Sequence, residues 1–303
     1  MTPLTALPRQ TDATPAAAPR PVALVTGGAH RIGREIALEL AAHGWDVAVH
    51  CRASLAQAEI TAAQARRGVA EAQAQTYAHL LAAAQTQDAS DAQCRVSAPA
   101  RAEVFAADLA DEADCAALVP SVVARFGRLD AVVNNASLFE YDDVDSFSAS
   151  AMERHWRTNT TAPIMLARAL HRHLVTRRAS GCVVNLLDQK LANPNPDYLS
   201  YTLSKAALEA ATTLLAQALA PLLRVCGVAP GVTLPSGPMS TDEFAGAHRL
   251  TPLQRSSTPA DVARAVRFLL ESPAITGTTL LVDGGQHLVA QPRDVLFLAQ
   301  AKD

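Results

Sequence analysis

A tyrosine and a lysine four residues apart could form an acid–base pair. They are Tyr201 and Lys205 in the sequence YTLSK, at the start of a segment with helical period, so both side chains should project from one face of a helix. An ammonium group beside a phenol favours the phenolate and lowers a pKa that is otherwise about 10. Tyr201 would then be usable as an acid or base near neutral pH. A surface Tyr–Lys pair on an amphipathic helix has the same spacing, so the pattern needs support from the rest of the chain.

An aspartate lies thirteen residues before this tyrosine. Asp188 directly follows the apolar stretch GCVVNLL (181–187), which is typical of a buried strand. In a parallel α/β sheet the carboxyl ends of the strands face the substrate, so a carboxylate there can take part in the chemistry of Tyr201. Asp188 could instead only cap the end of the strand.

A glycine-rich turn near the start of the chain predicts a dinucleotide site. In VTGGAHRIGREIA (25–37), Gly27, Gly28 and Gly33 stand between an apolar run and a segment of helical period. They would let the backbone turn tightly and let a pyrophosphate approach the N-terminus of a helix, where unpaired N–H groups and the helix dipole favour anions. The spacing is looser than G-x-G-x-x-G, so the position before the first helix supports the interpretation more than the pattern does.

The end of the second apolar run indicates which dinucleotide binds. NAD sites place an acid there to hold the ribose 2′-hydroxyl. The sequence VAVHCRAS (47–54) has His50, Arg52 and Ser54 at this point and no carboxylate, and a guanidinium with a hydroxyl suits a 2′-phosphate. Arg31, in the glycine-rich turn, could add a second charge. NADPH is therefore the predicted cofactor.

Two further strand ends extend the predicted cofactor groove. Asp108 closes the third apolar run near the place where an adenine amino group would lie, and NNAS (134–137) closes the fourth. Each signal is weak alone. In order along one sheet edge, they describe a single groove.

Short apolar runs without polar alternation predict the elements that must position these residues. Because such runs alternate with segments of helical period, they indicate a parallel sheet covered on both faces. The predicted fold is a single doubly wound Rossmann-type α/β domain, with a seven-stranded parallel sheet and helices on both faces. The predicted strands are residues 21–26, 46–51, 103–108, 130–137, 181–187, 224–230 and 278–285. The predicted helices include residues 31–43, 111–126, 150–178, 199–221 and 260–271.

Composition sets the expected limits of the domain. Residues 1–20 are rich in Pro, Ala and Thr without period, which predicts a disordered N-terminal tail. The Rossmann-type domain is expected over residues 21–290, followed by a C-terminal tail over 291–303. About fifty residues separate the second and third strands, so residues 54–100 are interpreted as an insertion, a long helix followed by a polar return loop.

Charge and composition exclude several function classes. A net charge of −3 and 4% aromatic residues argue against nucleic acid or an anionic membrane as partner. No apolar run approaches the ~20 residues of a membrane span, and the N-terminus does not resemble a secretory signal, so a cytoplasmic protein is expected. No metal site is expected, because the cysteines are widely spaced and without a C-x-x-C pair. They are Cys51, Cys94, Cys115, Cys182 and Cys226.

Taken together, the motifs resemble the short-chain dehydrogenase/reductase family over roughly residues 21–290. TGGAHRIG, NNAS, TNTTAP, YTLSK, PG (230–231) and VDGG (282–285) occur in the family's order. The resemblance implies that Tyr201 is the proton donor, that Lys205 lowers its pKa and holds the nicotinamide ribose, and that Asn159 supports a water relay to Lys205. The residues expected to bind cofactor are Gly27, His30, Arg31, Ile32, Gly33, His50, Arg52, Ser54, Asp108, Leu109, Asn135, Ala136, Ser137, Tyr201, Lys205, Pro230 and Gly231.

At Asp188 the general family carries a serine, and an aspartate there is similar to pteridine reductases. The segments NNASLFE, HCRAS and HRLTPLQR (248–255) resemble the same subfamily. The resemblance implies an NADPH-dependent reductase of a dihydropterin or dihydrofolate-like ring, and a homodimer or homotetramer. A carbonyl reductase acting on a 3-oxoacyl thioester stays open, as does an NADPH-binding sensor without turnover. The expected substrate-binding residues are Arg31, Ser137, Phe139, Asp188 and Tyr201.

Overall fold

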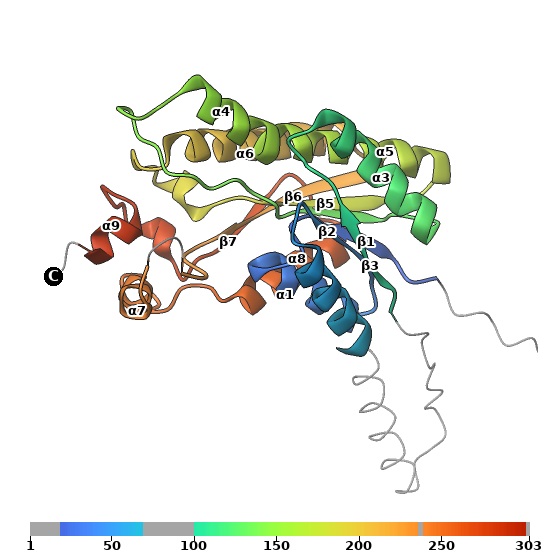
Figure 1. Cartoon of the computed structure of the whole chain (residues 1–303), viewed down its shortest axis with the longest axis horizontal. Helices are drawn as coiled ribbons and strands as arrows, with labels where there is room; N and C mark the ends of the chain where they lie inside the picture. Colours follow the sequence, from blue (N-terminus) through green and yellow to red (C-terminus); the bar gives the residue numbers. More distant parts are fainter. Residues whose placement is uncertain (1–18, 69–99, 236–238, 301–303) are drawn as a thin grey trace, which may run out of the picture.

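The computed structural model describes residues 19–68, 100–235 and 239–300, and within them the chain forms one parallel sheet. The strand order is β3-β2-β1-β4-β5-β6-β7, so the direction of winding reverses between β1 and β4 (Figure 1). The predicted seven-stranded, doubly wound sheet is confirmed. The strands are β1 (Val22–Val25), β2 (Asp46–Cys51), β3 (Ala102–Ala106), β4 (Ala131–Asn134), β5 (Gly181–Leu186), β6 (Leu223–Pro230) and β7 (Thr279–Val282).

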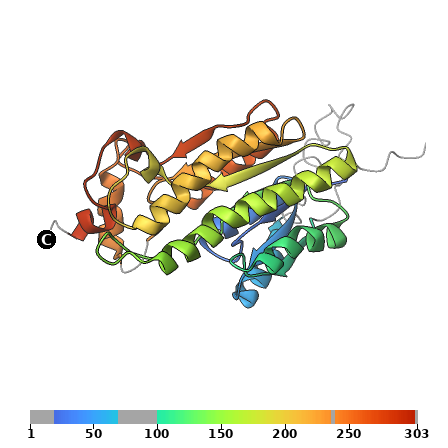
Figure 2. The ribbon, with the colours of Figure 1, turned by 90° about the horizontal axis from the view of Figure 1, so that it is seen from above.

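Helices cover both faces of the sheet. On one face lie α1 (Arg31–Ala42), α8 (Pro259–Glu271) and the helical residues 55–68. The other face carries α3 (Glu112–Phe126), α4 (Ala149–Trp156), α5 (Ala162–Arg177) and α6 (Leu199–Ala218). Figure 2 shows α5 and α6 running alongside each other over the sheet. A π-helical turn, Arg157–Thr161, joins α4 to α5 where the sequence predicted one continuous helix.

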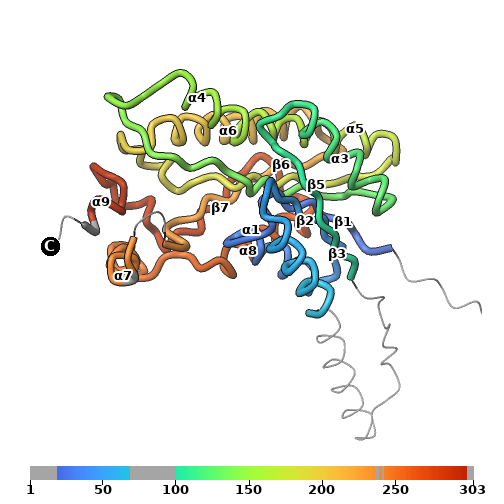
Figure 3. Tube along the Cα trace, viewed as in Figure 1, coloured from blue at the N-terminus to red at the C-terminus, as the bar shows by residue number. Residues whose placement is uncertain are grey.

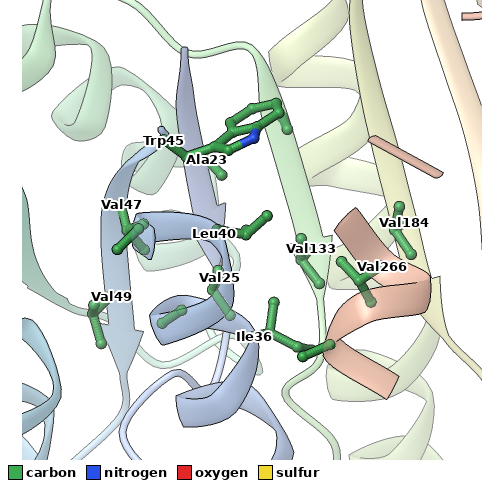
Figure 4. Close-up of a cluster of buried hydrophobic side chains, with 14 of the residues drawn as sticks. Ala23, Val25, Ile36, Leu40, Trp45, Val47, Val49, Val133, Val184 and Val266 are labelled. Atoms are coloured by element: carbon green, nitrogen blue, oxygen red, sulfur yellow. The ribbon is translucent and has the colours of Figure 1, made fainter. Parts of the chain in front are cut away.

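The strands are mostly apolar because the central ones contribute side chains to two cores. Val22 and Leu24 of β1 pack under α3 and α5, while Ala23 and Val25 pack against α1 and α8. This alternation follows from side chains that point to opposite faces at successive residues. Figure 4 shows the second core, with Ala23, Val25, Ile36, Leu40, Trp45, Val47, Val49, Val133, Val184 and Val266.

Two elements beyond the predicted set lie at the end of the molecule where β6 and β7 finish. They are α7 (Thr241–Arg249) and α9 (Val295–Gln300), which pack against each other (Figures 1 and 3). Short 3-10 turns, η2 (Gln189–Ala192) and η3 (Gln286–Leu288), lie beside them. Residues 291–300, which the sequence set apart as the start of a tail, pack on the domain, with Val295 and Leu296 buried.

Several sequence-based expectations fall on parts of the chain outside the described residues. They concern most of the N-terminal tail and residues 69–99 of the insertion, which include Cys94. Among the described residues, no helix combines the length and apolar character needed to span a bilayer. No cluster of three or more His, Cys, Asp or Glu side chains suited to a metal was found in the same ranges.

Candidate active site

A groove of about 700 Å³ runs along the carboxyl ends of the strands around the β1–β4 switch point. Open α/β sheets bind ligands at this point. A second cavity adjoins it and shares Arg31, Ile32, Phe139, Asp188 and Tyr201 with it. Most of the predicted cofactor residues line the groove, namely Gly27, His30, Arg31, Ile32, Gly33, His50, Arg52, Asp108, Leu109, Asn135, Ala136, Ser137 and Tyr201. Gly231 lines the second cavity, and Ser54, Lys205 and Pro230 line neither.

The glycine-rich turn has the shape that an anion site requires. Gly27 adopts φ +64°, and a Cβ on Gly33 would collide with the carbonyl oxygen of Gly27 and with Nδ2 of Asn135. Helix α1 follows, with His30 at its N-cap, no side-chain cap and no acidic residue in its first turn. Its N-terminal N–H groups are therefore free of intrahelical and capping partners and favour a phosphate. The turn fits a dinucleotide pyrophosphate.

His50 holds this turn in place. Its Nδ1 accepts a hydrogen bond from the Gly27 N–H at 3.1 Å, and its Nε2 lies 3.1 Å from the carbonyl oxygen of Ala107. An accepting Nδ1 carries no proton, so Nε2 is the donor and the ring is neutral. Burial lowers the pKa of His50, which favours the neutral ring. His50 was predicted to contact the cofactor; its two nitrogens are engaged by the protein, which makes it a support for the glycine-rich turn.

The two arginines expected near a 2′-phosphate differ in position. Arg52 lies exposed at the end of β2, lines the groove and has no ion-pair partner among the described residues. Arg31, with φ +52°, donates from Nη2 to the carbonyl oxygen of Pro235 at 3.0 Å. Its side chain therefore reaches the loop after β6, between the two cavities. That position agrees with its expected place among the substrate residues, and its role at a 2′-phosphate stays a prediction.

Asp188 and Tyr201 meet at the junction of the two cavities. The Tyr201 hydroxyl donates to Oδ2 of Asp188 at 2.8 Å, while Oδ1 accepts from the Lys190 N–H at 2.9 Å. Asp188 is thus both the N-cap of η2 and the partner of the phenol. Burial raises the pKa of Asp188. The pKa of Tyr201 is raised well above its usual value, first by burial and then by the charge of Asp188.

Lys205 lies near the ring of Tyr201 but is not hydrogen-bonded to its hydroxyl. Its Nζ donates to the carbonyl oxygen of Leu186 at 2.6 Å and lies 5.8 Å from the centroid of the Tyr201 ring. Burial lowers the pKa of Lys205 to about 8. In this structure a carboxyl group, and not the ammonium, is bonded to the phenol, and the expected effect of Lys205 on the pKa of Tyr201 stays a prediction.

Asn159 is hydrogen-bonded both to the loop after β4 and to α6, the helix that carries Tyr201 and Lys205. It lies in the π-helical turn, and such turns are frequent at functional sites. Its Nδ2 donates to the carbonyl oxygen of Leu138 at 2.9 Å and to the Ser204 hydroxyl at 3.0 Å, and its Oδ1 accepts from the Leu138 N–H at 2.7 Å. The side chain therefore bonds to the neighbour of Lys205 and not to Lys205 itself. The water relay stays a prediction.

The second cavity contains residues that the sequence did not single out. Tyr198 stacks on Phe139, with ring centroids 4.3 Å apart, and Phe139 meets Tyr201 edge-on at 4.7 Å. Lys190 is buried beside them. The spacing rule that selected Tyr201 discounted both Tyr198 and Lys190, because neither has a partner four residues away. Asp294 also lines this cavity and had no local signal.

Comparison with known proteins assigns the chain to a family. The model of the family described as Enoyl-(Acyl carrier protein) reductase matches residues 63–287. Pteridine reductase 1 of Leishmania tarentolae is 33% identical over 88% of this chain and 96% of its own length. The chain belongs to the short-chain dehydrogenase/reductase family. It is therefore an oxidoreductase that uses a nicotinamide cofactor, as predicted.

Other relatives show how far the family assignment reaches. FolM alternative dihydrofolate reductase 1 from Brucella canis, solved in complex with NADP, has a TM-score of 0.74 and 36% identity, covering 90% of this chain and 97% of its own. A putative ketoacyl reductase of granaticin polyketide synthesis from Streptomyces violaceoruber is 33% identical over 89% of this chain and 97% of its own length. Relatives named for pterin, folate and ketoacyl substrates thus have similar identity, and family membership alone does not select among them.

Proposed function

We propose that this short-chain reductase uses NADPH to reduce a dihydropterin or dihydrofolate-like ring. The observation that carries the proposal is the 2.8 Å hydrogen bond between Tyr201 and Asp188. An aspartate stands where the general family carries a carbonyl-binding serine. Relatives with similar identity and coverage include a pteridine reductase and an alternative dihydrofolate reductase.

The pair can deliver a proton to a ring nitrogen. NADPH, when bound in the groove, would supply a hydride for the carbon of a C=N bond. The nitrogen would then take the proton that the Tyr201 hydroxyl shares with Asp188. The pKa of Tyr201, raised well above its usual value by burial and by the charge of Asp188, keeps the phenol protonated near neutral pH. The C=N bond becomes CH–NH, and the pair regains its proton from solvent through the cavity that Asp188 lines.

The proposed preference for NADPH over NADH rests on the residues at the end of β2. Arg52 lines the groove there, and the neighbouring His50 and Cys51 supply no carboxylate to hold a 2′-hydroxyl. An unpartnered guanidinium suits a 2′-phosphate by charge-assisted bonding. The Brucella relatives, which are complexes with NADP, agree with this choice.

The ring-binding surface rests on Phe139. Its side chain is 42% exposed, although Tyr198 and Tyr201 hold it in a fixed orientation. An exposed, oriented aromatic ring beside the Asp188–Tyr201 pair offers a stacking surface to a flat heterocycle. Aliphatic 3-oxoacyl substrates gain less from such a surface.

NADPH oxidation with dihydrobiopterin, dihydrofolate and an acetoacetyl thioester, compared at equal concentration, tests the proposal. Turnover of a pterin or folate above that of the thioester is expected. Thioester turnover alone would assign a carbonyl reductase, for which the ketoacyl reductase relative gives precedent. Tight NADPH binding without turnover of any of the three would assign a sensor.

We also propose that the chain forms a homo-oligomer, a dimer or tetramer. Leu214 of α6 and Val175 of α5 are 63% and 51% exposed on neighbouring helices, and Leu203 of α6 is 47% exposed. Apolar side chains gathered on adjacent helices are typical of subunit interfaces. Sedimentation equilibrium of the full chain tests this, and a monomer at micromolar concentration would contradict it.

A further inference from the structure

Arg293 and Asp294, near the C-terminus, are hydrogen-bonded to the loop that leads into α6. Asp197 of that loop is 2% exposed. Its carboxylate accepts hydrogen bonds from Nε and Nη2 of Arg293 at 2.8–3.0 Å and from the Asp294 N–H at 2.6 Å. Burial alone would raise the pKa of Asp197, but these bonds outweigh it and the pKa is lowered. A bidentate pair of this kind fixes orientation as well as distance.

A second contact runs from the same segment to Asp188. Oδ2 of Asp294 lies 3.6 Å from Nζ of Lys190, which is 5% exposed. The same Nζ donates to the carbonyl oxygen of Asp197 at 2.5 Å. The backbone N–H of Lys190 in turn donates to Asp188, the partner of Tyr201. Three steps therefore connect the side chain of Asp294 to the phenol.

Aromatic rings form a parallel route from the same segment. Phe297 of α9 meets Tyr141 edge-on at 5.6 Å between centroids, and Tyr141 meets Tyr198 edge-on at 5.1 Å. Tyr198 stacks on Phe139 at 4.3 Å. Arg293 lies over the ring of Phe297, 4.7 Å from its centroid. The stacking surface proposed for the heterocycle is thus supported from behind by the C-terminal helix.

We propose that residues 293–297, here called the C-terminal clamp, position Asp188 and Phe139 for the reaction. The clamp acts through Lys190 on the carboxyl group and through Tyr141 and Tyr198 on the aromatic surface. Its residues are positioning residues, since other side chains lie between them and the proposed reacting atoms. The inference rests on the proposed function only for the identity of the substrate. The contacts that carry it are independent of what is reduced.

The clamp also adds charge to the site. The groups that face Asp188 are Tyr201 and Lys205 from α6, Lys190 from η2, and Asp294 from the clamp. Of these, the charge of Asp294 raises the pKa of Asp188, while Lys205 and the bonds from Lys190 and Tyr201 lower it. Loss of the Asp294 charge leaves the ammonium of Lys190 without its ion-pair partner and lowers the pKa of Asp188. The proton should then leave the catalytic pair at lower pH.

Hydrogen exchange of the full chain, without substrate, tests the positioning. Asp294→Asn is the sharpest variant, because Oδ1 of Asp294 accepts from the Leu296 N–H and asparagine keeps that cap while removing the charge. Amides of residues 188–198 should exchange about tenfold faster, because the buried ammonium of Lys190 loses its ion-pair partner. Glu153→Gln, which breaks the exposed pair with Arg157 on α4, is the matched control and should leave them unchanged. Unchanged exchange in Asp294→Asn would overturn the proposal.

The pH profile of kcat, measured with whichever substrate is turned over, tests the effect on the pair. The alkaline limb should move to lower pH in Asp294→Asn and return toward its original position in Asp294→Glu, with the Kd for NADPH unchanged in both. A lower kcat with an unmoved limb in Asp294→Asn would overturn the charge effect. If the amide exchange rates and the alkaline limb both change but only thioesters are reduced, the proposed pterin substrate is wrong. The positioning role of the C-terminal clamp is then still supported.

Discussion

The hydroxyl of Tyr201 lies 2.8 Å from Oδ2 of Asp188, and this bond joins the first turn of α6 to the end of β5. Both groups have raised pKa values, because both are buried; the charge of Asp188 further raises the pKa of Tyr201, whereas the hydrogen bond from Tyr201 lowers that of Asp188. Two acids that share a proton titrate as a unit. The pair can therefore hold and release a proton at the junction of the two cavities.

Asp188→Asn should lower kcat for ring reduction about 10²–10⁴-fold, the range typical of general acid–base assistance. Asparagine keeps the cap on η2 and a partner for the Tyr201 hydroxyl, but it cannot share the proton. Steady-state kinetics with a fluorescence titration of NADPH measure both effects, and the Kd for NADPH should stay nearly unchanged. Intact pterin turnover in Asp188→Ser would mean that the aspartate has only a structural role.

Activity should fall as pH rises through about 8. Lys205 has its pKa lowered to about 8 by burial, so its ammonium form is present below that pH and is lost above it. Ionisation of the Asp188–Tyr201 pair acts in the same direction. The profile of kcat/KM reports the free enzyme and is the quantity to measure. A single limb near 10, the usual range of lysine, would contradict the assignment.

Arg52→Asp should reverse or abolish the preference for NADPH over NADH. One charge-assisted bidentate contact contributes about 1.5–3 kcal/mol, so the preference should change tenfold or more. The ratio of kcat/KM for the two cofactors measures it. Equal use of both cofactors by the unmodified protein would refute the prediction at once.

Gly33→Ala should weaken NADPH binding tenfold or more. Its Cβ would overlap the carbonyl oxygen of Gly27 and Nδ2 of Asn135, so the glycine-rich turn must move at a cost of about 1–3 kcal/mol. Gly68→Ala is the matched control, because no atom of the described residues lies within 4 Å of the added atom. The Kd for NADPH, measured by fluorescence, should change in the first variant and not in the second.

Asp130→Asn should lower the free energy of unfolding by about 2–4 kcal/mol at pH 7, since a buried carboxylate loses its charge. Asp130 lies at the other end of the sheet and accepts from the Val22 N–H, Arg128 and Arg177. Burial would raise its pKa, but these bonds outweigh burial and the pKa is lowered.

The sign of the pH effect at Asp130 follows from that lowered pKa. Its stabilisation is present above the unfolded value of 3.8 and is lost as pH falls through the folded value. Urea unfolding at pH 7 and pH 3 should show a smaller difference between the two proteins at pH 3. An equal difference at both values would exclude the charge as its cause.

The sequence by itself determined the sheet, its seven strands and the chain order of the motifs. These features have local signals: mostly apolar runs such as 46–51, which the structure forms as β2 with the same limits, and a glycine-rich turn directly before α1. The carboxyl ends of parallel strands share one edge, so the motifs at those ends had to gather in one groove. The placement of Tyr201 and Lys205 on one helix was likewise predictable from the local sequence.

Only the tertiary structure decided which charged groups act on one another. Lys205 was expected to lower the pKa of Tyr201, and the fold instead bonds Asp188 to the phenol. Asp294, from a segment expected to be a tail, lies 3.6 Å from Lys190. Periodicity and spacing describe neighbours along the chain, whereas burial and ion pairing depend on how distant segments pack. The protonation of the site is set by that packing.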